Sequence, residues 1–207
     1  KLQYFIYIYI ILIIIDNIET IKHYMHCLIS SRTFSSIPLN KELINNVNNI
    51  IKNIKNYKNY TFIDFGSGYG NILYYFKDTF NKLIGIELNE GSFNESLYLL
   101  KNYKNISLLN MPMEDYIFPN TNIILYMYEP LFDVNCKNRM QVYNKVLNNL
   151  YKCNKKIYII YVGSNTISNI FYNCFYNKKM FEEKFKLINK KNTSLWPFNR
   201  NIYILKN

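Results

Sequence analysis

The chain has 207 residues, which is enough for one domain with a substantial buried core and short for two. Apolar residues make up 49% and charged residues 19%, a balance that excludes an intrinsically disordered chain. The net charge of +11 comes almost entirely from lysine. Either a polyanionic partner such as nucleic acid or a lysine-rich solvated surface accounts for this charge.

The cysteines and histidines argue against a metal centre. Cys27, Cys136, Cys153 and Cys174 are far apart and form no CxxC pair, and only 2 histidines are present to complete a zinc site. So few cysteines in a chain of this length also give no disulfide framework, which favours a reducing compartment. We therefore expect an intracellular protein, cytoplasmic or organellar, that needs no metal.

Residues 2–15 form an almost unbroken apolar run that ends before Asp16. The run is shorter than the roughly 20 residues with which a helix crosses a bilayer. It is either the remnant of a membrane anchor or signal segment, which would bring the protein to a membrane, or a segment that packs on the domain or on a partner. Residues 1–37 are accordingly separated, as an apolar segment and lead-in, from an expected domain at 38–207.

Residues 38–162 predict an amphipathic helix followed by alternating strands and helices. The helix covers 40–56, with apolar residues every three or four positions. The expected strands cover 60–65, 82–88, 106–109, 122–128 and 156–162, and the expected helices cover 71–77, 91–103, 138–151 and, beyond them, 168–181. Strands joined by crossover helices indicate a doubly wound α/β fold with a mostly parallel sheet, which binds ligands at the carboxyl ends of its strands.

The last part of the chain does not continue the alternation of strands and helices. Residues 185–188 and 201–205 are two short strand-like runs, joined by a polar loop that carries Trp196, Pro197 and Arg200. An antiparallel hairpin appended to the parallel sheet explains this pattern. Together with the preceding strands it gives a mostly parallel, seven-stranded sheet with a C-terminal antiparallel hairpin.

A ligand-binding pattern stands at the end of the first expected strand, in the segment Asp64-Phe-Gly-Ser-Gly-Tyr-Gly70. Glycine lets the backbone turn tightly and lets a ligand approach, while the N–H groups of the next helix's first turn stay unpaired. The acid in front and the glycines at every second position differ from the G-x-G-x-x-G loop of dinucleotide-binding proteins. The segment therefore predicts a site for another nucleoside-bearing ligand.

This segment resembles motif I of the class I S-adenosylmethionine (SAM)-dependent methyltransferases, a Rossmann-like superfamily of transferases. The resemblance implies that SAM is the cofactor and that Gly66, Ser67, Gly68 and Gly70 hold it, with Asp64 facing the ammonium group of its methionine moiety. No metal is required, because the sulfonium is already a strong electrophile and catalysis is mainly positioning.

Glu87 closes the second expected strand, about 20 residues after the glycine loop, where nucleoside-binding α/β folds place a carboxylate for the ribose hydroxyls. We place Glu87 and its neighbour Leu88 in the cofactor site. Methyltransferases of this class often carry an acid just after the third strand, where it contacts the adenine amino group. This chain has Asn110 there and Asp115 in the following turn, and either one is predicted to contact adenine.

The fourth expected strand ends in Tyr126-Met-Tyr-Glu-Pro-Leu131. The glutamate departs from the Asn/Asp-Pro-Pro-aromatic motif of enzymes that methylate planar amino groups, which argues against nucleobase-amino chemistry. The segment is more similar to the Tyr-Asn-Pro-Phe variant of a little-characterised class I group. The order of segments also resembles membrane-anchored mitochondrial protein-lysine methyltransferases and histone-lysine methyltransferases of the non-SET type. Glu129, with Tyr126 or Tyr128, is then the candidate catalytic group that orients a lysine amine, unless Glu129 is only a turn residue.

Two functions from different classes fit these patterns. The favoured one is an active methyltransferase with a protein or RNA acceptor, a protein lysine being preferred. The alternative is a catalytically inactive methyltransferase-like module that serves as an RNA- or membrane-associated scaffold, because Asn110 and Glu129 stand at off-pattern positions. Lysines and aromatic residues also interleave at 52–60 and 172–185, a pattern that either binds single-stranded RNA or reflects ordinary packing.

Overall fold

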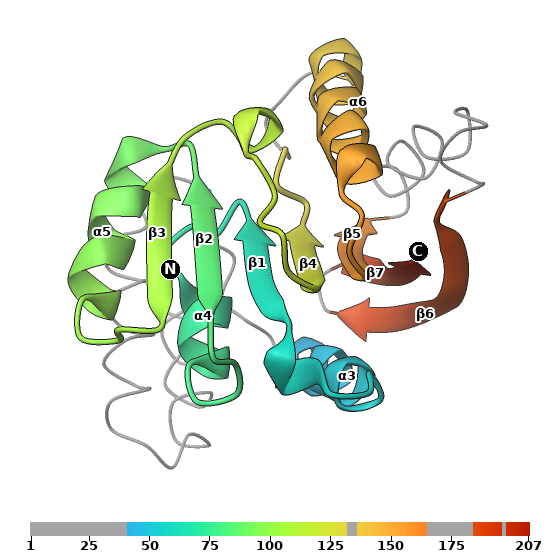
Figure 1. Ribbon diagram of the computed structural model, residues 1–207, viewed down its shortest axis with the longest axis horizontal. Helices are drawn as coiled ribbons and strands as arrows, with labels where there is room; N and C mark the ends of the chain where they lie inside the picture. Colours follow the sequence, from blue (N-terminus) through green and yellow to red (C-terminus); the bar gives the residue numbers. More distant parts are fainter. Residues whose placement is uncertain (1–40, 132–135, 165–183, 196–197) are drawn as a thin grey trace, which may run out of the picture. The chain divides into compact units, whose positions relative to one another are not determined.

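The computed structural model describes residues 41–131, 136–164, 184–195 and 198–207, which all belong to the compact unit Leu39–Asn207. They form one seven-stranded sheet with the order β3-β2-β1-β4-β5-β7-β6 (Figure 1). The strands are β1 Thr61–Phe65, β2 Leu83–Glu87, β3 Ile106–Asn110, β4 Ile123–Tyr128, β5 Ile157–Ser164, β6 Lys186–Leu195 and β7 Phe198–Lys206. Strands β1 to β5 pair in parallel, and β7 is antiparallel to both of its neighbours. The predicted sheet and its antiparallel hairpin are confirmed.

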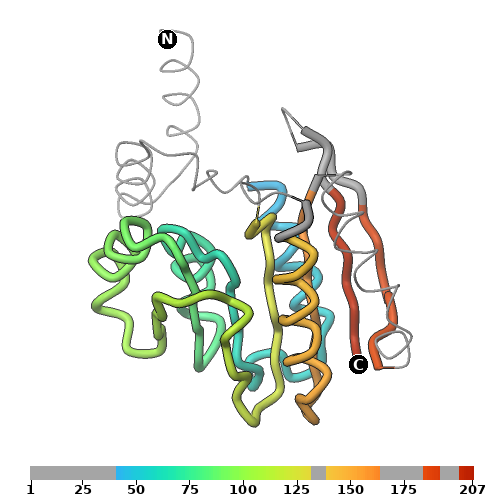
Figure 2. Tube along the Cα trace, turned by 90° about the horizontal axis from the view of Figure 1, so that it is seen from above, coloured from blue at the N-terminus to red at the C-terminus, as the bar shows by residue number. Residues whose placement is uncertain are grey.

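Helices cover both faces of the sheet. The helices α3 (Lys41–Lys52), α4 (Asn71–Phe76) and α5 (Glu90–Leu100) pack on one face, and α6 (Cys136–Lys152) packs on the other. Figure 2 shows β7 and β6 side by side at one edge, away from the green segment that contains β2 and β3. This layering is the doubly wound arrangement expected from the alternating pattern.

The central strands are buried on both faces, which explains why they appear in the sequence as continuous apolar runs. All five residues of β1 are buried, and so are residues 123–127 of β4. Ile63 and Phe65 pack in the cluster beneath α6, and Phe62 packs in the cluster beneath α3 and α4. Because side chains alternate along a strand, Asp64 shares the face of Phe62 and interrupts an otherwise apolar layer.

The helix α3 starts where the sequence predicted but ends at Lys52 rather than at residue 56. Its apolar stripe, which includes Leu43, Val47 and Ile51, is buried against the sheet. Beyond it the chain turns, and Asn56 has a φ of +59°. Asparagine tolerates this left-handed conformation better than most residues, and a helix cannot continue through it. The short 3₁₀ helix η1 (Tyr57–Asn59) then leads into β1.

The predicted polar loop of the hairpin was wrong in its extent. The strand β6 continues to Leu195 and β7 begins at Phe198, so Arg200 pairs in register with Ser164 of β5 and with Thr193 of β6. The polar residues of β6 misled the prediction, because an edge strand tolerates charged and polar side chains that a central strand does not.

Several predictions fall on residues that the structure does not describe. They are the apolar run 2–15, the lead-in to residue 37, the helix at 168–181, and the loop residues Trp196 and Pro197. Among the described residues, no helix has the length and apolarity needed to cross a membrane.

Candidate cofactor site

The loop between β1 and α4 lies at the carboxyl-end edge of the sheet, where the arrowheads of β1 and β2 point (Figure 1). Its three glycines all have positive φ: +77° at Gly66, +53° at Gly68 and +78° at Gly70. Side chains with a Cβ rarely adopt such values, so glycine is required here by the backbone itself. The result is a tightly turned loop in which Gly66 is exposed and Gly68 and Gly70 are buried.

Gly66 is required for a second reason. A Cβ added to it would stand 2.7 Å from Cβ of Pro130, the residue that follows β4 by two positions. The glycine therefore lets the first turn of the loop pack directly on the segment after β4. The sequence indicated the edge from Tyr126 to Pro130 as the place that directs methyl transfer, but it did not predict that Pro130 packs on the glycine loop.

The end of β2 holds the loop in place. The N–H groups of Gly66 and Ser67 both donate to the carbonyl oxygen of Ile86, at 2.9 and 3.1 Å. The Glu87 carboxylate accepts from the N–H of Gly68 at 2.8 Å through Oε2 and from the N–H of Asn89 at 2.8 Å through Oε1. Each carboxylate oxygen can accept more than one hydrogen bond, so Glu87 can serve the loop and a ligand together.

Asp64 lies beneath the loop and is only 3% exposed. Burial, and to a smaller extent the charge of Glu87, raises the pKa of the Asp64 carboxyl well above its usual range. Its neighbours in the sheet register are Gly85 on β2 and Tyr126 on β4. A cationic ligand group at this position would lower the free energy of the ionised carboxylate, which burial alone raises.

Two more polar groups are buried close to Asp64. The hydroxyl groups of Ser67 and Tyr126 have no hydrogen-bond partner within the described part of the chain, and the two residues are 7% and 2% exposed. Buried polar groups are normally satisfied, so these hydroxyls mark a place that a polar ligand or water can complete. A bare glycine cradle beside three buried polar side chains fits an amino-acid-bearing nucleoside.

Gly85 also belongs to this site and was not predicted. A Cβ added to it would lie 2.6 Å from Cδ1 of Leu73 and 2.9 Å from Oγ of Ser67. The missing side chain thus makes room for the loop to lie over β2. A glycine inside a strand often marks such a close approach, so its position in the second strand was an available signal.

Asn110 at the end of β3 faces the end of β2. Its Nδ2 donates to the carbonyl oxygens of Glu87 at 2.8 Å and Leu88 at 3.1 Å, which leaves its side-chain oxygen outside these two bonds. Leu88 is 67% exposed, an unusual state for a leucine beside a polar cradle. Asp115 lies farther along in the 3₁₀ helix η2 (Met113–Asp115) and is exposed. The structure thus brings Asn110 and Leu88, rather than Asp115, to Glu87.

The three predicted catalytic residues at the end of β4 lie on two different faces of the sheet. Tyr126 and the half-buried Tyr128 lie on the face of Asp64, and the charge of Asp64 is among the causes that raise the pKa of Tyr126 after burial itself. Glu129 follows the strand with a φ of +41°, and its N–H donates to the carbonyl oxygen of Val162 at 3.0 Å. Glutamate rarely has such a φ, which is a strained conformation.

The side chain of Glu129 is buried near a group of tyrosines under α6. Glu129 is 4% exposed, and its charge contributes to raising the pKa of Tyr161, after burial and the neighbouring Tyr143. The hydroxyls of Tyr143 and Tyr161 are 3.3 Å apart. Arg139 of α6 is also buried, and its positive charge lowers the pKa of Tyr161. Glu129 therefore lies in a buried polar cluster beside the end of β4.

Known structures share this architecture. The magnesium protoporphyrin IX methyltransferase from Synechocystis PCC 6803, with bound SAM, matches with a TM-score of 0.65 and 9% identity over 94% of this chain and 99% of that chain. The N-methyltransferase NodS from Bradyrhizobium japonicum, in complex with S-adenosylhomocysteine, matches with a TM-score of 0.63 and 8% identity over 89% and 98%. The 23S rRNA methyltransferase ErmE matches with a TM-score of 0.59 and 9% identity over 82% and 68%.

The chain has the class I SAM-dependent methyltransferase fold. This confirms the resemblance seen in the sequence at the level of the superfamily fold, while the closer likeness to one subgroup stays a prediction. Scans of protein-family models and of curated proteins find no match to the sequence. Among the described residues, no three His, Cys, Asp or Glu side chains are grouped as a metal site would require.

Proposed function

We propose that this protein is a SAM-dependent methyltransferase. The observation that carries the proposal is the glycine cradle: Gly66, Gly68 and Gly70 all have positive φ, and Glu87 holds the cradle by a hydrogen bond to Gly68. Similar structures with bound SAM or S-adenosylhomocysteine share the fold. SAM supplies an electrophilic methyl group, which the lone pair of an acceptor takes as the carbon–sulfur bond breaks.

Different residues of the site would bind different parts of SAM. The Glu87 carboxylate would accept hydrogen bonds from the ribose hydroxyls, and the buried Asp64 carboxylate would attract the ammonium group. The exposed Leu88 offers an apolar surface to adenine, and the free side-chain oxygen of Asn110 would accept from its amino group. This assignment favours Asn110 over Asp115 as the adenine contact.

The acceptor would approach the end of β4. The segment at Pro130 lies beside the glycine loop, because Gly66 packs on Pro130, and Tyr128 comes just before it at the end of β4. Glu129 is buried under α6, so it would support the Pro130 segment from below rather than contact the acceptor directly. Tyr126 is too deeply buried to reach an acceptor and would instead support Asp64 beneath the cofactor.

Two of the similar structures above are named as methyltransferases of a porphyrin and of ribosomal RNA, and none of those above is named as a protein-lysine methyltransferase. The preference for a protein lysine over RNA, drawn from the sequence, gains no support from them. An inactive module that binds without turnover is the second candidate, favoured by the off-pattern residues Asn110 and Glu129.

Calorimetric titration with S-adenosylhomocysteine tests the cofactor site. We expect the wild type to bind and Glu87→Gln to weaken binding by about 10- to 100-fold, since hydrogen bonds to a charged group contribute about 1.5–3 kcal/mol. Glu90→Gln is the matched control, because Glu90 is exposed at the start of α5 and should leave affinity nearly unchanged. The proposal fails if the wild type does not bind, or if the two variants behave alike.

A second measurement separates the active enzyme from the inactive module. Purified protein is incubated with cell extract and SAM labelled on its methyl group. Label transferred to a protein or RNA band would identify the acceptor class and exclude the inactive module. If S-adenosylhomocysteine binds in the calorimetric titration but no label is transferred, the inactive module is favoured.

A further inference from the structure

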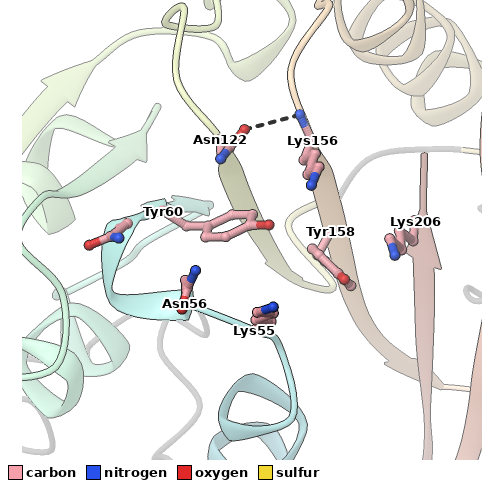
Figure 3. A pocket seen from close by; sticks show the side chains of 8 residues that line it. Lys55, Asn56, Tyr60, Asn122, Lys156, Tyr158 and Lys206 are labelled. Atoms are coloured by element: carbon pink, nitrogen blue, oxygen red, sulfur yellow. Dashed lines mark hydrogen bonds between the residues drawn. The ribbon is translucent and has the colours of Figure 1, made fainter.

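A basic depression lies at the other end of the sheet, away from the glycine loop. It has a volume of about 450 Å³ and is formed by the η1 segment, the starts of β4 and β5, and the end of β7 (Figure 3). Its lining consists of lysine, asparagine and tyrosine: Lys55, Asn56, Asn59, Tyr60, Asn122, Lys156, Tyr158 and Lys206. Four separate parts of the chain thus meet around one concave surface.

The depression is positively charged. Lys55, Lys156 and Lys206 all line it and are exposed, and no carboxylate lines it. Within the described part of the chain none of these three lysines forms an ion pair. Three uncompensated ammonium groups around a hollow attract an anion more strongly than the same charges spread over a convex surface.

Two tyrosines give the depression an aromatic wall. The rings of Tyr60 and Tyr158 make an edge-to-face contact with centroids 6.0 Å apart, and Tyr158 is only partly buried. The Lys206 ammonium lies 5.5 Å from the centre of the Tyr158 ring. A planar group that stacked on Tyr158 would therefore lie beside a positive charge.

The asparagines add neutral hydrogen-bonding groups. Asn122 accepts from the N–H of Lys156 at 3.3 Å through its Oδ1, so its Nδ2 is directed elsewhere. Asn56 and Asn59 also line the hollow, and both are exposed. Side-chain amides can both donate to and accept from the edge of a base.

We propose that this depression binds a nucleotide segment of single-stranded nucleic acid, with phosphates at the lysines and a base against Tyr158. Proteins that bind single strands combine lysine-lined grooves with aromatic side chains on which bases stack. A volume of about 450 Å³ is within the range of small-ligand sites and suits about one nucleotide. The site is separate from the cofactor cradle and does not depend on methyl transfer.

The combination of groups favours a single strand over other anions. A duplex presents phosphates but keeps its bases stacked inside, so the tyrosines would have no role. A phosphorylated peptide would satisfy the lysines but provides no base for the aromatic wall. Both serve as competing ligands in the test.

Fluorescence anisotropy with a labelled 12-nucleotide single strand tests the site in the full-length chain, with RNA and DNA of the same sequence. We expect Lys156→Gln/Lys206→Gln to weaken binding and to lower the slope of log affinity against log salt concentration by about 1.4, since each phosphate contact on a single strand contributes about 0.7. Tyr158→Leu should weaken binding about fivefold or more without changing the slope.

The control is Lys101→Gln/Lys104→Gln, which removes the same charge from exposed residues beside β3, where Lys101 also lies over a tyrosine ring. The control should leave the slope unchanged. Equal effects of the two double variants, no effect of Tyr158→Leu, or equal affinity for a duplex or a phosphopeptide would each overturn the proposal. Tighter binding of RNA than DNA, or equal binding of both, supports it and shows whether the ribose hydroxyl is read.

Discussion

The two ends of the sheet, at each of which we propose a binding site, are built by different physical means. At the carboxyl ends of β1 and β2, glycines with positive φ form a tight loop beside a buried acid. At the amino ends of β4 and β5, unstrained lysines and tyrosines present long side chains to solvent. The first arrangement suits a ligand of fixed shape, whereas the second suits a flexible polyanion. Substitutions should therefore act on stability at the first end and on salt-dependent binding at the second.

The largest effect is expected for Gly66→Ala. An alanine at a φ of +77° is strained by about 1–2 kcal/mol, and its Cβ would press on Pro130, at a further cost of about 1–3 kcal/mol. We expect the free energy of unfolding to fall by about 2–5 kcal/mol in urea titrations.

Gly91→Ala provides the matched control, since Gly91 lies inside α5 and a Cβ there would meet only Oδ1 of Asn89 at 3.3 Å. Alanine favours a helix over glycine by about 1 kcal/mol, so this variant should be as stable as the wild type or slightly more so. If the two alanine variants had equal stability, neither the positive φ of Gly66 nor its close approach to Pro130 would require glycine.

A smaller, pH-dependent effect is expected for Asp64→Asn. Because burial raises the pKa of Asp64 in the folded state, the folded protein retains a proton that the unfolded chain releases as pH rises. The wild type should therefore lose stability as pH rises between the unfolded-state and folded-state pKa values. The variant does not lose stability in this way, because asparagine does not titrate. It should therefore be more stable than the wild type at neutral pH, and the difference in stability between the two proteins should vanish in acid.

Thermal unfolding of both proteins between pH 3 and pH 8 measures this difference, and other titrating groups cancel in the comparison. The variant should also bind SAM more weakly, because the ammonium group loses its counter-ion. Parallel stability profiles across the pH range would show that Asp64 titrates normally.

The smallest effect is expected for a substitution at one of the two sites on ligand affinity at the other site. Residues this far apart, with no shared partner, should contribute independently. Glu87→Gln should leave the affinity for a single-stranded oligonucleotide within about twofold, and Lys156→Gln/Lys206→Gln should do the same for S-adenosylhomocysteine. A larger cross-effect in either titration would mean that the two ends are coupled.

The sequence predicted the turn and the strand ends that form the glycine loop, and it predicted the basic depression only in part. Asp64, the three glycines and Glu87 are local features, because a strand end and a tight turn follow from consecutive residues. The approach of Gly85 and Pro130 to the loop depends on which strands are neighbours, which their local patterns do not give. The depression requires Asn122, Lys156 and Lys206 to meet residues 55–60. Only this last segment stood out, by its interleaved lysines and aromatic residues.

The strand order has a consequence for folding during synthesis. β7 lies between β5 and β6, and it supplies Lys206 to the basic depression. The parallel strands leave the ribosome first, yet one edge of β5 stays unpaired until residues 198–207 emerge and insert beside it. During that interval the exposed edge of β5 is open to pairing with another chain, and a chaperone that covered this edge would prevent such pairing.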